Sequence, residues 1–126
     1  MQIFNTMSRQ KEEFVPQTPG EYRIYVCGPT VYNYIHIGNA RPMIVFDTLR
    51  RYLEYCGNKV YYVSNITDID DKLIKKGREE GTSMQEVARK FEAEYIKDSD
   101  GLNVKAPTVR PRATEHIGEI IHIVKD

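Results

Sequence analysis

The sequence predicts an α/β fold in which parallel strands are joined by a helix. Three observations support this class: an alternating apolar stretch at residues 22–27, an amphipathic stretch at residues 40–56, and a stretch rich in β-forming residues at 60–64. A strand, a helix and a second strand in this order form a βαβ unit, whose strands run parallel. The carboxyl ends of both strands then meet at one edge of the sheet.

Length and composition fit one folded domain. The chain has 126 residues, 40% of them hydrophobic, and its 18 Lys and Arg residues balance its 18 Asp and Glu residues. This balance gives no global field that would attract nucleic acid. No apolar run approaches the roughly 20 residues that a membrane span needs, and two cysteines are too few for a disulfide framework. We therefore expect a cytoplasmic protein without membrane contact.

The first elements along the chain are short. Residues 2–5 predict a strand, residues 8–13 a charged turn, and residues 16–20 a loop punctuated by proline and glycine. In the strand at residues 22–27, Tyr22, Ile24 and Val26 fall on one face because side chains alternate along a strand.

The helix at residues 40–56 has the clearest pattern. Asn39 is predicted to be its N-cap, Pro42 suits its first turn and Gly57 its C-terminal stop. Cys56 lies at the opposite pole of the unit from Cys27 and is interpreted as a buried apolar residue. The apolar face has the spacing of one side of a helix and consists of Val45, Phe46, Leu49, Tyr52, Leu53 and Cys56.

Three more helices are expected in the second half of the chain. One begins near Lys72, with Asp70 and Asp71 interpreted as caps, and another covers residues 82–100 from a start at Thr82 or Ser83. The inward-facing residues of the second are expected to be Val87, Ala88, Phe91 and Tyr95. The last helix presents an apolar face made of Ile117, Ile120, Ile121 and Val124.

A proline-punctuated connection at residues 102–111 leads to the last helix. Two arginines at its end, Arg110 and Arg112, are open to two interpretations: contact with a nucleotide or RNA, and structural or solvated pairing.

Residues with chemical potential gather at the predicted strand ends. Cys27 ends the first strand, His36 precedes the helix, and Thr67 and Asp68 follow the second strand. The topology brings them to the edge where open α/β sheets bind ligands. An imidazole beside the N–H groups of a helix N-terminus forms an anion site suited to phosphate.

Both Cys27 and His36 are open to plainer interpretations. Cys27 could be an inert core cysteine, because free cysteines are among the most buried residues, although the adjoining Gly28 and Pro29 favour a backbone that turns outward and exposes the thiol. His36 could be a hydrogen-bonded loop histidine.

Several motifs, in order along nearly the whole chain, resemble those of the cysteinyl-tRNA synthetases, which are class I aminoacyl-tRNA synthetases. They are I-F-N-T at residues 3–6, K-E-E-F-V-P at 11–16, Y-V-C-G-P-T-V-Y at 25–32, H-I-G-N at 36–39, N-I-T-D-I-D-D-K at 65–72 and P-R-A-T-E-H-I at 111–117. The resemblance implies a Rossmann-type parallel sheet with flanking helices, the first half of a class I synthetase catalytic domain.

The resemblance implies that L-cysteine is activated by ATP with Mg²⁺ and then transferred to tRNA(Cys). It assigns ATP binding to His36, Ile37, Gly38 and Asn39, and it makes His36 and Asn39 the catalytic pair that stabilises the transition state of adenylate formation. Asn39 stands where the family signature has a second histidine. An asparagine keeps an amide donor but carries no positive charge.

For the amino-acid pocket, the resemblance implies contributions from Cys27, Gly28, Thr30 and Thr67, with Cys27 as a ligand of Zn²⁺. A catalytic zinc keeps an open position that a substrate thiolate can fill. Serine would be a far poorer ligand for this ion, so the metal would separate cysteine from serine.

Residues 1–126 are interpreted as the N-terminal part of a nucleotide-binding catalytic domain that is cut in or after the last helix. The other zinc ligands and the K-M-S-K-S loop of the family are expected downstream, so the isolated fragment is expected to be inactive. Two alternatives stay open: a related cysteine-activating ligase that acts on an amino sugar, and a non-catalytic nucleotide-binding module.

Overall fold

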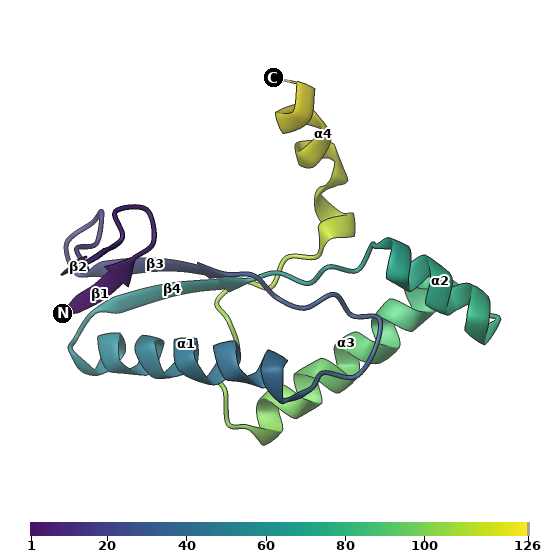
Figure 1. Ribbon diagram of the computed structural model, residues 1–126, viewed down its shortest axis with the longest axis horizontal. Coiled ribbons are helices and arrows are strands. Elements are labelled where there is room, and N and C mark those ends of the chain that lie inside the picture. The colour runs from purple at the N-terminus through teal and green to yellow at the C-terminus, as the bar shows by residue number, and fades with distance from the viewer. Residues whose placement is uncertain (126) are drawn as a thin grey trace.

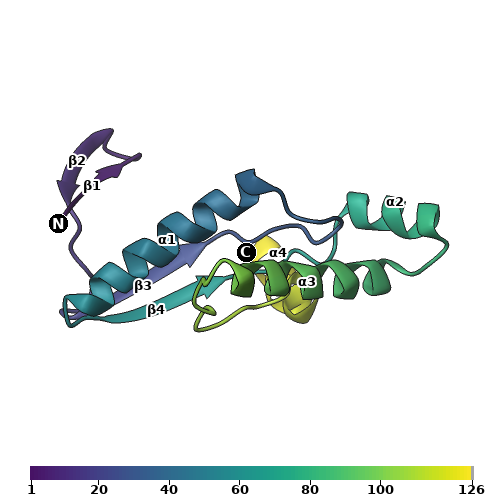
Figure 2. The ribbon, with the colours of Figure 1, turned by 90° about the horizontal axis from the view of Figure 1, so that it is seen from below.

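The computed structural model describes residues 1–125 and confirms the α/β class (Figure 1). Two short strands form an N-terminal hairpin, and two longer strands form a parallel pair with α1 running along one face (Figure 2). The elements are β1 (Gln2–Asn5), β2 (Gln10–Glu13), β3 (Glu21–Val26), α1 (Ile37–Tyr55), β4 (Lys59–Ser64), α2 (Asp71–Glu80), α3 (Met84–Gly101), a 3₁₀-helix (Ala113–His116) and α4 (Ile117–Lys125).

The βαβ unit forms as the sequence predicts. Strands β3 and β4 are parallel, in register from Glu21 opposite Lys59 to Val26 opposite Ser64. Side chains along β3 alternate between partly buried and exposed positions after its first residue, as expected for a strand with one face toward a helix.

Helix α1 begins three residues earlier than its apolar pattern indicates. Its first residue is Ile37 and its N-cap is His36, so the prediction of Asn39 as the N-cap is wrong. Pro42 therefore lies in the second turn rather than the first. Since proline has no N–H, the hydrogen bond that residue 42 would normally donate four residues back is missing there.

The other end of α1 is only partly as predicted. Gly57 follows the C-cap with a positive φ of 85°, as a helix stop requires. Cys56 is exposed, so its interpretation as a buried residue is wrong. Leu53 is buried, whereas Val45 and Tyr52 are 53% and 50% exposed. The buried stripe is therefore narrower than predicted, and a polar segment packs along one side of the helix.

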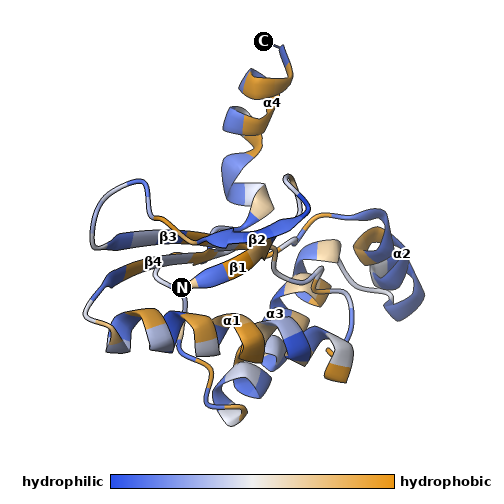
Figure 3. Ribbon diagram, turned by 60° about the vertical axis from the view of Figure 1, so that its left-hand side comes forward, coloured by the Kyte–Doolittle hydropathy of each residue, from blue (hydrophilic) through white to orange (hydrophobic). Residues whose placement is uncertain are grey.

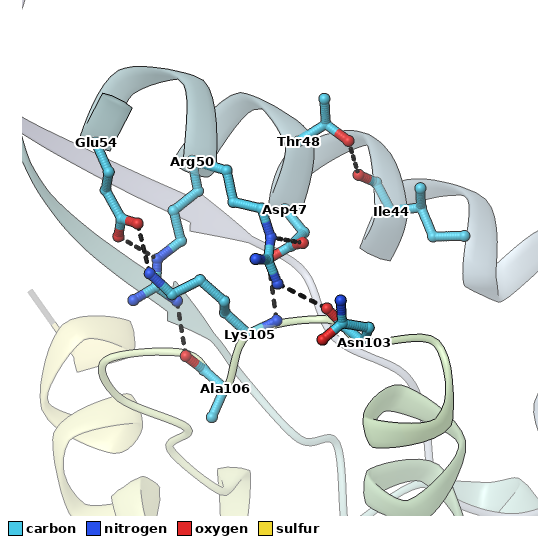
Figure 4. Close-up of polar contacts among 9 residues, drawn as sticks. Ile44, Asp47, Thr48, Arg50, Glu54, Asn103, Lys105 and Ala106 are labelled. Carbon is cyan, nitrogen blue, oxygen red and sulfur yellow. Dashed lines mark hydrogen bonds and ion pairs between the residues drawn. The ribbon is translucent and has the colours of Figure 1, made fainter. Parts of the chain in front are cut away.

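That segment is the connection after α3, and it is fastened to α1 by a set of polar contacts (Figure 4). Lys105 N donates to Asp47 Oδ1 at 3.0 Å, and Lys105 Nζ pairs with Glu54 Oε2 at 2.5 Å. Arg50 and Arg51 donate to backbone carbonyl oxygens of the same connection at 2.7 Å. The contacts hold the connection beside the helix that leads away from the strand ends.

After these contacts with α1, the connection continues beside β4. Isolated parallel bridges pair Val63 with Val109 and Ile66 with Arg112. Ile66 N donates to Pro111 O at 2.8 Å. The prolines of this stretch cannot donate to a ladder, which explains why it pairs with β4 at single positions and not as a continuous strand.

The main core lies beneath the strand-end loops. Val31 and Ile66 from these loops pack with Leu73 of α2 and with an apolar face of α3. That face was predicted correctly and consists of Val87, Ala88, Phe91 and Tyr95, all buried. The loops after β3 and β4 are therefore supported directly by packed side chains.

Two buried acidic residues fix the 3₁₀-helix above this core. Glu92 of α3 accepts hydrogen bonds from Arg112 Nε and Nη2 at 2.8 to 3.1 Å. Asp68 accepts from Thr114 N at 3.0 Å and from Thr114 Oγ1 at 2.5 Å. Arg112 also pairs with Glu115 at 2.9 Å, so its structural interpretation is confirmed.

The two ends of the described chain are the least covered. Residues 10–13 form β2 of the hairpin, so the prediction of a charged turn over residues 8–13 is wrong in that part. The charged sequence of residues 10–13 does not predict a strand by itself, and antiparallel pairing with β1 provides the hydrogen bonds that form one. Helix α4 projects from the rest of the structure (Figure 1, Figure 3), and its apolar side chains Ile117, Ile120, Ile121 and Val124 are exposed.

No helix among residues 1–125 has both the length and the apolar character that crossing a bilayer demands.

The ladder between β3 and β4 changes register just past its end. Val26 pairs with Ser64, but the next bridge pairs Thr30 with Thr67. Residues 27–29 therefore stand opposite residues 65–66, three against two, which is a bulge of one residue. Gly28 permits this bulge: a Cβ there would lie 1.7 Å from the backbone oxygen of Asn65.

Replacement of Gly28 by alanine should therefore destabilise the fold. The added Cβ meets a backbone atom, which cannot rotate away, so we expect Gly28→Ala to lower the free energy of unfolding by roughly 3 kcal/mol. Gly101→Ala is the control, because a Cβ at Gly101 meets nothing within 4 Å. Urea denaturation of both variants checks this, and a Gly28→Ala variant as stable as the control would contradict the bulge geometry.

The N-terminus of α3 predicts a pH dependence. Glu86 accepts hydrogen bonds from Thr82 Oγ1, Ser83 Oγ and Ser83 N, and these contacts lower its pKa from 4.5 to about 2. The carboxylate therefore stabilises the fold above pH 4.5, and this contribution is lost as the pH falls toward about 2.

Glu86→Gln should remove this contribution, so the variant should be less stable than the unsubstituted chain at pH 6. The difference in free energy of unfolding should shrink as denaturant titrations are moved from pH 6 to pH 2.5. A difference that stays constant over this range would contradict the capping role of the carboxylate.

Candidate functional site

The residues selected from the sequence lie past the carboxyl ends of β3 and β4. Cys27 directly follows β3, and the bridge between Thr30 and Thr67 brings two distant segments side by side. Thr67 N donates to Pro29 O at 3.1 Å, and Val31 N donates to Thr67 O at 3.2 Å. The parallel topology therefore assembles this edge as predicted.

The thiol of Cys27 is exposed, which excludes its interpretation as a core cysteine. Its Sγ lies 3.6 Å from the carbonyl oxygen of Gly28. Its exposure continues the alternation of β3, in which Tyr25 is exposed and Val26 is partly buried. The thiol is thus accessible to a ligand at the strand end.

His36 and Asn39 cap α1 reciprocally. His36 Nδ1 accepts a hydrogen bond from Gly38 N at 3.0 Å, and Asn39 Oδ1 accepts one from His36 N at 3.1 Å. This is a capping box. A Cβ on Gly38 would lie 2.7 Å from His36 Cε1, so the glycine makes room for the imidazole. The side chain of Ile37 is 90% exposed beside them.

This capping determines the chemistry of His36. Because Nδ1 accepts a hydrogen bond, the neutral ring carries its proton on Nε2, which can donate to a ligand. The amides of Gly38 and Asn39 donate to His36 itself. A phosphate at this helix end would therefore take the Nε2 donor or displace the ring from the Gly38 amide. The partial positive charge of the helix end favours an anion in either case.

A cavity of about 130 Å³ opens between the bulge, α1 and α3. Ligand pockets are usually about 300–1,000 Å³, so this cavity could enclose a small ligand but not a nucleotide. Its walls include four of the predicted site residues, Cys27, Gly28, Gly38 and Asn39. Four others are not among its lining residues: Thr30, His36, Ile37 and Thr67.

The cavity is also lined by Arg110, for which the sequence left two interpretations open. The guanidinium carbon of Arg110 lies 5.6 Å from the centre of the Tyr95 ring. Arg110 Nε is buried and has no hydrogen-bond partner among the described residues. Burial raises the pKa of Tyr95, so its hydroxyl stays neutral at physiological pH. No local signal places Arg110 here, because its position depends on the path of the whole connection.

Asp68 does not serve as the ligand-facing residue that its position after β4 suggested. It is buried, and its carboxylate is occupied by Thr114. Asp70 caps α2 by accepting from Lys72 N at 2.8 Å, as predicted. These carboxylates are structural, and neither lines the cavity.

The described residues do not complete a metal centre. They contain no group of three or more His, Cys, Asp or Glu side chains that could hold an ion. Cys27 offers one sulfur ligand at the edge of the sheet, whereas a catalytic zinc takes three protein ligands. Residues 1–125 alone therefore do not fit zinc, and any further ligands would have to come from outside them.

Comparison with known proteins identifies the family. Residues 13–126 match the family described as tRNA synthetases class I (C) catalytic domain. The chain is 59% identical over 126 residues to the cysteine–tRNA ligase of Clostridioides difficile (strain 630), covering 100% of this chain and 27% of that protein. It is also 59% identical over 125 residues to the cysteine–tRNA ligase of Carboxydothermus hydrogenoformans, covering 99% of this chain and 27% of that protein.

The family match begins at the last residue of β2 and covers β3 to α4, and the chain spans just over a quarter of the length of the two relatives. The chain belongs to the family of class I (C) tRNA synthetase catalytic domains.

Proposed function

We propose that this chain supplies part of the catalytic domain of a cysteine–tRNA ligase. The observation that carries the proposal is the 59% identity, over nearly all residues, to two proteins of that name. Because the chain covers 27% of their length, we assign the activity to a protein that also contains the other regions. Residues 1–126 alone are expected to be inactive. The substrates, ATP, L-cysteine and tRNA(Cys), support a cytoplasmic location.

The proposed reaction has two steps. The carboxylate of L-cysteine attacks the α-phosphorus of ATP, which forms cysteinyl-adenylate and releases pyrophosphate. A ribose hydroxyl at the end of tRNA(Cys) then attacks the cysteinyl carbonyl and releases AMP. Neither step needs a covalent bond to the enzyme, so orientation and charge stabilisation supply the rate.

The N-terminus of α1 is the proposed ATP-binding end. His36 donates from Nε2 to a phosphate oxygen while Nδ1 keeps the Gly38 amide, and the amide of Ile37 adds a donor beside it. Asn39 holds the His36 backbone through Oδ1 and offers Nδ2 to a phosphate. These donors stabilise negative charge that develops on the α-phosphate in the transition state. Mg²⁺ is expected to arrive with the ATP phosphates.

The bulge and the Thr30–Thr67 bridge form the proposed cysteine-binding end. The exposed thiol of Cys27 and the half-buried Thr67 flank it. Gly28 and Thr30 are proposed as its rim, where small side chains leave room for the amino acid. The cavity is lined by both Cys27 and Gly38, which supports placing the two proposed ends next to each other.

Cys27 is proposed as one ligand of a Zn²⁺ ion whose other ligands come from outside the described residues. The ion would supply a preference for a thiolate over a hydroxyl. Cys27 is accessible, which supports this role, and the described residues by themselves hold too few ligands for the ion.

Cysteine-dependent exchange of pyrophosphate into ATP tests the proposed function. A protein with the full length of the relatives should catalyse it, and residues 1–126 alone should not. In the longer protein, His36→Ala should reduce the exchange rate by about 100-fold, because a donor to the transition state is lost.

His116→Ala is the matched control for this test, because His116 is an exposed histidine on the 3₁₀-helix and is not part of the N-terminus of α1. Its exchange rate should equal that of the unsubstituted protein. Exchange that is independent of cysteine, or equal losses in both histidine variants, would contradict the proposal.

Zinc content tests the role of Cys27. In the longer protein, Cys27→Ser should lower the bound zinc measured by atomic absorption and should raise the rate with serine relative to cysteine. Cys56→Ser is the control, since Cys56 is equally a free and exposed cysteine but ends α1 at the other pole. Zinc content that is unchanged in Cys27→Ser would exclude ligation by this thiol.

A further inference from the structure

The side chain of Asn65 fills the gap that the bulge leaves in the β3–β4 ladder. Asn65 follows β4 directly and faces the extra residue of the other segment. Gly28 N, which has no carbonyl acceptor in the ladder at this point, donates to Asn65 Oδ1 at 2.8 Å. Tyr25 OH donates to the same oxygen at 3.1 Å.

The other half of the Asn65 amide faces the second segment of the site. Asn65 Nδ2 lies 3.4 Å from Thr67 Oγ1 and donates to it. A hydroxyl that accepts one hydrogen bond keeps its own O–H free to donate. The contact therefore directs the Thr67 O–H away from Asn65 and leaves it for a ligand.

We propose that Asn65 is a positioning residue for the cysteine-binding end of the site. One planar amide joins three groups: the Gly28 amide next to Cys27, the Tyr25 hydroxyl and the Thr67 hydroxyl. The amide thereby sets the distance between the segment that carries Cys27 and the Thr67 side chain. Asn65 itself does not line the cavity, and we assign it no contact with the substrate. This inference rests on the proposed function and adds a residue to which no role in it was given.

The chemistry of the site requires an amide at this position. Oδ1 must accept from two donors while Nδ2 donates to a hydroxyl, and a carboxylate cannot do the second. The backbone of Asn65 is also constrained, because its carbonyl oxygen occupies the space that a Cβ on Gly28 would need. The side chain and the backbone of one residue therefore both define the bulge.

Asn65 has a natural control at the opposite end of the same strand. Asn58 precedes β4 and is half-buried, and its Nδ2 donates to Leu53 O at 3.1 Å. Replacement of either asparagine removes a structural hydrogen bond. Only Asn65 contacts the segments that carry Cys27 and Thr67.

The experiment measures steady-state pyrophosphate exchange in the full-length protein. Asn65→Ala should lower kcat/KM for cysteine roughly tenfold to 100-fold, the effect of a displacement of about 1 Å in a catalytic site, mainly through a raised KM for cysteine. The KM for ATP should stay within about twofold, because Asn65 makes no contact with the described start of α1. Asn65→Asp, which keeps the acceptor for Gly28 N, should lose less than Asn65→Ala.

Two results would overturn the inference. One is a parallel rise of the KM values for cysteine and ATP in Asn65→Ala; the other is an Asn58→Ala variant with the same cysteine defect. Both would mean that Asn65 contributes to general stability only.

Hydrogen exchange separates this inference from the proposed function. If the unsubstituted protein does not incorporate pyrophosphate into ATP in the presence of cysteine, the proposed function fails. The positioning role of Asn65 can then still be measured by deuterium uptake. Mass spectrometry should show faster deuterium uptake in peptides spanning residues 25–31 of Asn65→Ala, because the Gly28 amide loses its acceptor, but not of Asn58→Ala. Equal uptake in both variants would refute the bracing role of Asn65.

Discussion

The parallel pairing of β3 with β4, together with its change of register after Val26 and Ser64, is the constraint on which the rest of the structure depends. A regular ladder would continue pairing past these residues in the same register. The extra residue shifts the register beside the exposed Cys27, and pairing resumes between Thr30 and Thr67. The strand-end loops thereby become an open edge without losing their attachment to one another.

Buried polar contacts then hold this edge against the core. Glu92 of α3 accepts from Arg112, and Asp68 of the loop after β4 accepts from Thr114. Both elements therefore contact the same 3₁₀-helix and its N-cap. Buried carboxylates are stable only when they are paired or hydrogen-bonded, and each of these has its partner. Helix α1 is held by other contacts, which Lys105 makes with Asp47 and Glu54. The ATP-binding and cysteine-binding ends proposed above thus rest on different supports.

The sequence predicted the βαβ unit and the core face of α3 because both follow from hydrophobic periodicity. It misplaced the start of α1 because the side chains of Asn39 and His36 can both accept a hydrogen bond at a helix start, and the fold decides which of the two residues is the N-cap. The exposure of Cys56 and the position of Arg110 depend on how the connection after α3 packs against α1. The role of Asn65 depends on a register change between distant segments, which no local pattern records.

A crystal structure of the full-length protein bound to a non-hydrolysable analogue of cysteinyl-adenylate would test the central claim that one edge of this sheet binds both parts of the intermediate. The account predicts the phosphate group beside His36 and Gly38, and the cysteine side chain between Cys27 and Thr67. An analogue bound away from the carboxyl ends of β3 and β4 would contradict it.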